Sequence, residues 1–179
     1  MEPWFIATEK FGPATGEAWE KYIAWSGLTQ LDEVVSLDAM LCHSILPDIE
    51  DDFWTHIVAE DALVHLFVDL EFLLDRIPPG TAHNLLCVFR NPATLPAAPA
   101  GPVDFEFLGY DLVDRDGLAS ALTNCGGFAE VFDNRELSSK GLLTSHPRAL
   151  QVQSDLRRLF PDEPHADCDV WAVFRARGI

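Results

Sequence analysis

HNLLCVF, residues 83–89, is the part of the chain that indicates the architecture most directly. Its apolar residues run without interruption from Leu85 to Phe89, and a Pro-Pro-Gly turn at 78–80 precedes it. A short continuous apolar run bounded by turn residues is typical of a strand covered on both faces. We therefore expect a central strand here, with its neighbouring strands supplied by more distant parts of the sequence.

The flanking sequence predicts further strands and helices. Aromatic, β-branched or alternating residues favour strands, whereas apolar residues at helical spacing that end at Gly or Pro favour helices. The type of the element at 53–58 stays open. The predicted strands are 4–8, 31–41, 103–113 with a bend at Gly109, and 169–175, and the predicted helices are 16–26, 66–77, 118–122 and a segment that follows Ser145 as N-cap and ends before Pro161.

Irregular alternation of strands and helices predicts the fold class. It favours a single α+β domain over residues 1–179, with a mostly antiparallel sheet and about three packed helices. The segment 91–102 holds four prolines and four alanines. We interpret it as an extended surface connection within one domain, because the strand at 83–89 needs partners from beyond it.

The charge is distributed unevenly along the chain. The formal net charge is −17, and residues 1–80 carry −13 of it, from sixteen Asp and Glu against three Lys and Arg. Such a field repels nucleic-acid phosphates and anionic membranes, so we expect neither as a partner. It favours a basic protein or a metal ion, and the alternative is a solvated surface that aids solubility.

The sequence also bears on the compartment. No basic region followed by an apolar run opens the chain, and His65, Asp69 and Glu71 interrupt the longest apolar stretch at 63–74, so we expect no export signal or membrane span. The four cysteines lie far apart, and at least Cys42 and Cys87 fall in apolar segments. Free thiols in a reducing cytoplasm are the interpretation that fits them.

The first candidate site is the densest acidic segment of the chain. A tryptophan among carboxylates suits binding of a basic protein, because Trp is enriched at binding hot spots and surrounding charges steer the partner. A run of acids is usually a solvated edge, and the alternative for Trp54 is that it belongs to the core. The predicted partner-binding residues are Asp48, Glu50, Asp51, Asp52 and Trp54, beside Phe53.

The second candidate is catalytic and involves two residues from distant segments. Two glycines follow Cys125, and such a loop allows convergent N–H groups, so Cys125 could act as a nucleophile with His165 as its base. The other interpretation is an ordinary tight turn with a small apolar cysteine beneath it. His165 would then only satisfy backbone groups at the entrance to the following strand.

We predict no metal site and no cofactor. His165 and Cys168 have a spacing that can offer two ligands, and Cys42-His43 could add two more, yet the chain has no CxxC or HxxxH pair. The acidic segment lacks the spacing of a calcium loop. His56 and His65 lie in apolar elements, where a hydrogen-bonded boundary histidine is expected. Motifs for nucleotide binding, serine hydrolases and metalloproteases are absent from the sequence.

Three segments carry a resemblance to known proteins: SALTNCGGF at 120–128, GLL at 141–143 and PHADCDVWAVFR at 164–175. They resemble the C-terminal signatures of small acidic bacterial proteins of unassigned function, over about a third of the chain, and this resemblance implies no activity. In size and acidity the chain is also similar to immunity proteins, which bind and block a cognate toxin.

These observations lead to two functional hypotheses. The first is a non-enzymatic cytoplasmic binding protein whose acidic N-terminal half docks a basic protein partner, as an immunity protein does. The alternative is a cysteine-dependent hydrolase or transferase that uses Cys125 with His165. The sequence does not indicate an oligomeric state.

Overall fold

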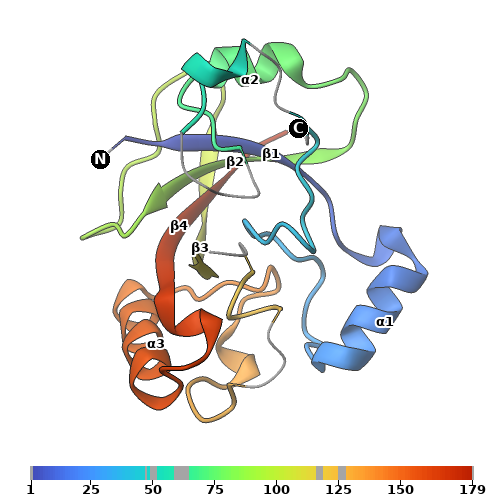
Figure 1. Ribbon diagram of the computed structural model, residues 1–179. Helices are drawn as coiled ribbons and strands as arrows, with labels where there is room; N and C mark the ends of the chain where they lie inside the picture. The colour runs from blue at the N-terminus through green and yellow to red at the C-terminus, as the bar shows by residue number, and fades with distance from the viewer. Residues whose placement is uncertain are drawn as a thin grey trace.

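The computed structural model describes residues 2–46, 48, 52–58, 65–115, 119–124 and 128–178. The described residues form one α+β domain with a four-stranded antiparallel sheet in the order β1-β2-β4-β3 (Figure 1). The strands are β1 (Trp4–Glu9), β2 (His83–Arg90), β3 (Phe105–Asp114) and β4 (Cys168–Ala176), and the α-helices are α1 (Glu17–Ser26), α2 (Leu70–Arg76) and α3 (His146–Leu159). Short 3₁₀ turns lie at η1 (Pro13–Thr15), η2 (Phe53–Thr55), η3 (Asn134–Glu136) and η4 (Pro164–Asp167).

The predicted central strand is confirmed. β2 pairs with β1 on one side and β4 on the other, and its residues His83 to Phe89 are all buried. Helices cover one face, where Trp19 of α1, Leu73 of α2 and Val152 of α3 join the main apolar cluster. Irregular chain covers the other face, where Val35 and Leu37 pack against the sheet. Figure 1 shows α2 and α3 at opposite ends of the domain.

The bend predicted at Gly109 is confirmed as a β-bulge. The register between β3 and β4 shifts between Phe107 and Gly109, and Gly109 has a φ of 155°, which side chains of L-residues rarely adopt. A Cβ atom there would lie 2.7 Å from Leu142 Cβ and from the Leu143 carbonyl oxygen. The close approach of the segment at Leu142 and Leu143 therefore requires a glycine at position 109.

The predicted helix at 66–77 begins later than the apolar spacing indicates. Leu66 and Phe67 lie in extended chain, and Phe67 forms bridges with Phe5 and Ile57. α2 starts only at Leu70, where the Asp69 side chain accepts a hydrogen bond from the Phe72 N–H at 3.1 Å. This N-cap fixes the start of the helix, because a residue that caps has extended backbone itself.

The strand predicted at 31–41 is wrong. Val34, Val35, Ser36, Leu37 and Asp38 are buried in succession, whereas a half-buried strand would bury every second residue. Side chains bond to the local backbone instead: Asp38 Oδ1 accepts from the N–H groups of Met40 and Leu41, each at 2.9 Å. These turns replace the sheet ladder that period-two alternation predicted.

The short helix predicted at 118–122 is also wrong over its described residues, 119–122. Ser120 forms a bridge with Val113, and the Ala121 N–H donates to the Leu112 carbonyl at 2.8 Å, so this segment runs along β3.

The predicted helix after Ser145 is confirmed as α3, but the Ser145 side chain makes no cap hydrogen bond. The connection 91–102 contains no helix or strand, as predicted. Within the described ranges, no helix has both the length and the apolar character needed to cross a membrane.

Candidate functional site

The Trp54 side chain lies on the outside of a short aromatic unit. In η2, Phe53 turns inward and its ring meets the edges of Phe67 and Phe72, with centroids 5.5 and 5.6 Å apart. Trp54, the next residue, turns outward and is 61% exposed. The structure therefore answers the question left open by the sequence: Trp54 is a surface residue, and Phe53 is the core residue of this turn.

Backbone and ring contacts hold the Trp54 segment on the chain before α2. The N–H of Val68 donates to the His56 carbonyl at 2.8 Å, and the N–H of Val58 donates to the Leu66 carbonyl at 2.7 Å. The His56 ring stacks on Phe72 at 3.8 Å, with its Nδ1 3.5 Å from Asp69 Oδ2. His56 is thus a boundary histidine, partly exposed, that packs on Phe72 and lies beside Asp69.

A second exposed apolar residue, Val68, lies in the same unit and is 46% exposed. Carboxylates flank the two apolar residues: Asp52 forms an ion pair with Arg76, Asp69 caps α2, and Glu71 is exposed in its first turn. We call this surface the acidic aromatic face, defined by Asp52, Trp54, Val68, Asp69 and Glu71. Of the other predicted partner-binding residues, Asp48 is exposed, and Glu50 and Asp51 lie outside the described residues.

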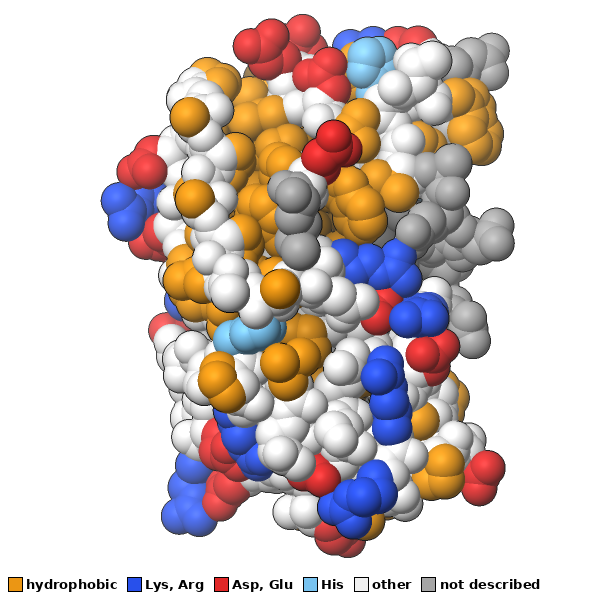
Figure 2. Space-filling view, turned by 90° about the vertical axis from the view of Figure 1, so that its left-hand side faces the viewer, with side chains coloured by type: hydrophobic (Ala, Val, Ile, Leu, Met, Phe, Trp, Pro, Cys, Tyr) orange, Lys and Arg blue, Asp and Glu red, His pale blue; other side chains and the backbone are white. Residues whose placement is uncertain are grey.

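A groove of about 390 Å³ adjoins this face. Val68, Asp69 and Glu71 line one side, residues 99–103 line the other, and Phe5 and Phe105 lie between, with their rings 6.0 Å apart. Figure 2 shows a face whose upper half carries apolar side chains, with carboxylates, basic groups and histidine at the top edge and further Lys and Arg side chains lower down. The end of the molecule that holds α2 is therefore acidic and apolar together.

Of the predicted catalytic pair, Cys125 lies outside the described residues. His165, in η4, is mostly buried, with Nδ1 3.6 Å from Asp114 Oδ2 at the end of β3. Its ring meets the ring of Phe128, three residues after Cys125 in the sequence, at 5.6 Å. His165 Nδ1 has no hydrogen-bond partner among the described residues, so Asp114 lies beside the imidazole without a bond that would fix its orientation.

The other cysteines are poor nucleophiles. Cys42, Cys87 and Cys168 are buried free thiols, as predicted. Burial raises the pKa of Cys87 and that of Cys168 each to about 12, and it raises the pKa of Cys42 further. Since the thiolate is the reactive form, these three side chains are inert near neutral pH.

The residues that could have held a metal are not brought together. His43 is exposed and lies 3.5 Å from Glu9, whereas the Cys42 thiol donates to the buried Val34 carbonyl. Across the part of the chain that the structure describes, no three His, Cys, Asp or Glu side chains form a group that could bind a metal ion.

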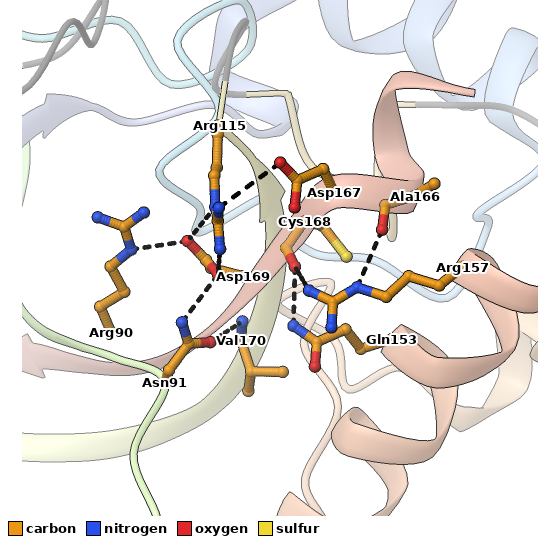
Figure 3. A network of polar contacts seen from close by, with 10 residues as sticks. All are labelled: Arg90, Asn91, Arg115, Gln153, Arg157, Ala166, Asp167, Cys168, Asp169 and Val170. Atoms are coloured by element: carbon orange, nitrogen blue, oxygen red, sulfur yellow. Dashed lines mark hydrogen bonds and ion pairs between the residues drawn. The ribbon is translucent and has the colours of Figure 1, made fainter. Parts of the chain in front are cut away.

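Two buried carboxylates hold loops against the sheet, and sequence reasoning missed both. Asp169 of β4 is 2% exposed at its side chain and accepts hydrogen bonds from Arg90 at 2.6 Å, Asn91 at 2.8 Å and Arg115 at 3.1 Å. Figure 3 shows Arg90, Asn91 and Arg115 converging on this carboxylate from different sides. Burial acts to raise the pKa of Asp169, but these hydrogen bonds outweigh it and the pKa lies below its usual value.

The second buried carboxylate, Asp111 of β3, has no cationic partner among the described residues. It accepts hydrogen bonds from the hydroxyls of Ser36 and Ser120, the latter at 2.6 Å. Nearby, Asp38 accepts from the Ser120 N–H at 2.8 Å. Burial, with the Asp38 charge added, raises the pKa of Asp111 to about 6 despite the hydrogen bonds that lower it. The cluster of Asp111, Ser36, Asp38 and Ser120 thus joins the loop at 31–41, which was predicted as a strand, to the segment 119–122, which was predicted as a helix.

Comparison with known proteins gives no relative. No protein-family model, no curated protein and no solved structure matches this chain. The resemblance to small acidic bacterial proteins and to immunity proteins therefore stays a hypothesis.

Proposed function

We propose that this chain is a non-enzymatic, cytoplasmic binding protein that docks a basic protein partner through the acidic aromatic face. The observation that carries the proposal is the 61% exposure of Trp54 in a segment of the chain that is rich in acidic residues. Covering the exposed part of a Trp side chain contributes on the order of 3 kcal/mol. Trp54 is a suitable anchor because the ring contacts beneath it already fix the turn that presents it.

The charges around Trp54 support a cationic partner. Residues 1–80 carry a net charge of −13, so a basic protein is attracted over long range, and the attraction weakens as salt rises. Glu71 and Asp48 are both exposed, and neither has an ion-pair partner among the described residues. Free carboxylates of this kind can pair with Lys or Arg of a partner without first breaking a bond within the protein.

The experiment isolates a partner from the native host and then tests where it binds. Bound proteins are cross-linked, identified by mass spectrometry, purified and titrated calorimetrically at about 50 and about 300 mM salt. We expect a basic partner whose affinity falls with salt and falls at least ten-fold in the variant Glu71→Lys. The control Glu130→Lys makes the same change in net charge at an exposed site elsewhere.

Two results would refute the proposal. One is a partner whose binding is indifferent to salt. The other is an equal loss of affinity in Glu71→Lys and Glu130→Lys, because that would show a response to net charge rather than to this face. If the partner proves to be a toxic enzyme that the chain inhibits at equimolar ratio, the immunity-protein form of the proposal is supported.

A second function is favoured by the position of His165, whose ring lies beside the Asp114 carboxylate and against Phe128. In this alternative, His165 activates Cys125 for attack on an acyl or similar group. A maleimide probe at neutral pH would then label Cys125 ahead of the three buried cysteines, and His165→Gln would slow labelling at least ten-fold. Equal rates in the wild type and in His165→Gln would end this alternative.

A further inference from the structure

The groove beside the acidic aromatic face has a floor of aromatic rings. Phe5 of β1 and Phe105 of β3 come from the two edge strands of the sheet, and their ring centroids lie 6.0 Å apart. Apolar side chains also supply much of the walls, and these are Val68, Leu70, Pro99, Pro102 and Val103. An aliphatic group that enters the groove is therefore in contact with apolar surface on several sides.

Two carboxylates are the only charged side chains among the described residues that line the groove. Glu71 is exposed and has no hydrogen bond or ion pair within the described part of the chain. Asp69 is held in place, because Oδ1 accepts from the Phe72 N–H at 3.1 Å and Oδ2 lies 3.5 Å from His56 Nδ1. A carboxylate can accept about four hydrogen bonds, so both side chains keep free acceptor positions.

The groove offers hydrogen-bond acceptors but no donor side chain. Its described lining consists of Phe, Val, Leu, Asp, Glu, Pro, Ala and Gly, and at neutral pH none of these has a side-chain N–H or O–H group. Pro99 and Pro102 also lack a backbone N–H. The N–H of Val68 already donates to the His56 carbonyl. An occupant that donates hydrogen bonds is therefore favoured, and an anion is disfavoured.

The basic side chain of α2 does not compensate these carboxylates. Arg76 pairs with Asp52, and its guanidinium carbon lies 4.2 Å from the centroid of the Phe72 ring. Arg76 does not line the groove, and neither does any other Lys or Arg of the described residues. The negative charge of the groove is thus left for a cation from outside the domain.

We propose that the groove binds one long cationic side chain, Lys or Arg, of the basic protein partner. The methylene groups of that side chain lie on the apolar floor and walls, and its charged head donates to Glu71 and Asp69. Long basic side chains suit such a site, because they bury their stems while the charged head stays near water. This inference rests on the proposed function, since it names the group of the partner that is received beside the acidic aromatic face.

The test uses n-pentylammonium chloride, which has the methylene stem and the charge of such a side chain and needs no partner protein. It is titrated into the intact, isotope-labelled chain at about pH 7 with ionic strength held constant, and NMR follows the backbone amide shifts. We expect saturable binding with a dissociation constant on the order of 1–10 mM, as suits so small a ligand. The shifts should concentrate at residues 68–71 and 100–103, which line the groove.

Two related probes separate the contribution of charge from that of the stem. Pentanol keeps the stem without the charge, and we expect it to bind weaker by about five-fold or more, because charge-assisted hydrogen bonds are the stronger ones. Pentanoate carries the opposite charge on a similar stem, and it should show no saturable binding.

Two variants assign the binding to the groove. Glu71→Gln removes the free carboxylate from an exposed side chain, and we expect it to weaken pentylammonium by about five-fold or more. The control Asp75→Asn makes the same change in charge on α2 outside the groove lining, and it should change affinity less than about two-fold. Val68→Asn replaces exposed apolar surface, and it should weaken binding by about three-fold.

The inference is overturned if the shifts do not saturate, if pentanol binds as tightly as pentylammonium, or if Glu71→Gln keeps full affinity. Such a failure, alongside a salt-sensitive partner that Glu71→Lys weakens, would leave the proposed function standing without this groove. Saturable pentylammonium binding alongside a partner indifferent to salt would instead refute the proposed function and leave a cation site.

Discussion

The imidazole of His56 lies flat on the ring of Phe72, with centroids 3.8 Å apart and planes 7° apart. This stack joins the segment that carries Trp54 to α2, because Phe72 is a helix residue and His56 ends the η2 turn. The exposed tryptophan is therefore presented by a turn that is anchored to regular structure.

Phe72→Leu should loosen this turn. The variant loses the stack with His56 and the edge contact with Phe53, and we expect a loss of about 1–2 kcal/mol in the free energy of unfolding. Hydrogen exchange should show faster exchange at the N–H groups of His56 and Ile57, which bond to the Phe53 carbonyl. Phe160→Leu, which instead alters the contact with Phe128, should leave these two amides unchanged.

Asp111→Asn should change how stability depends on pH. The folded pKa of about 6 lies above the unfolded value of roughly 3.9, so the folded chain binds more protons between these values. The contribution of Asp111 to the free energy of unfolding is therefore fully present below about pH 4. It falls by about 3 kcal/mol in total as the pH rises through about 6.

Urea unfolding from pH 4 to 7 measures this effect in wild type and Asp111→Asn. Asp111→Asn has no carboxyl group to titrate, so its free energy of unfolding should not show the fall of about 3 kcal/mol. The free energy of unfolding of the variant minus that of the wild type should therefore increase from pH 4 to pH 7. The exposed carboxylate variant Asp75→Asn serves as the control. A constant difference between Asp111→Asn and wild type at every pH would contradict the prediction.

Asp169→Asn should destabilise the domain by roughly 3 kcal/mol, because it leaves Arg90 and Arg115 without their shared, nearly buried carboxylate. Thermal unfolding of the matched variant Asp133→Asn should stay close to wild type, since the Asp133–Arg135 pair is solvent-exposed. Equal shifts in melting temperature for the two variants would show that Asp169 is not the structural hub we describe.

Gly109→Ala should cost roughly 3 kcal/mol or more, since it combines an unfavourable φ with a Cβ 2.7 Å from a backbone oxygen. Gly101→Ala is the matched control, because a Cβ there meets nothing within 4 Å. Denaturation of both variants in urea checks the prediction, and a Gly109→Ala protein as stable as Gly101→Ala would contradict it.

The strands were predictable where apolar patterning alone determines them. β2 and β4 are the two central strands, so their residues are apolar on both faces. The bulge in β3 was predictable because a glycine, Gly109, interrupts the strand pattern there. The segment 31–41 was wrongly predicted as a half-buried strand because Ser36 and Asp38 are buried. Their side chains form hydrogen bonds with Asp111 and with the Ser120 N–H, which lie far along the sequence. Period-two patterning cannot distinguish a polar residue facing solvent from one buried with a partner.

The candidate site was predictable in part. The acidic segment identified Trp54, but its exposure depends on which of Phe53 and Trp54 turns inward, and that is set by Phe67 and Phe72 from later in the chain. Val68 was missed because the helical spacing assigned to 66–77 hid the alternation of buried Phe67 with exposed Val68.

Calorimetric titration of the purified basic partner with the variants Trp54→Ala and Trp25→Ala tests the proposed interface most directly. Both tryptophans are similarly exposed, 61% and 58%, and Trp25 lies on α1 outside the acidic aromatic face. We predict that Trp54→Ala weakens binding by roughly 30-fold, as expected for a hot-spot residue that contributes about 2 kcal/mol, whereas Trp25→Ala changes it less than about two-fold. Unchanged affinity in Trp54→Ala, or an equal loss in both variants, would contradict docking through this face.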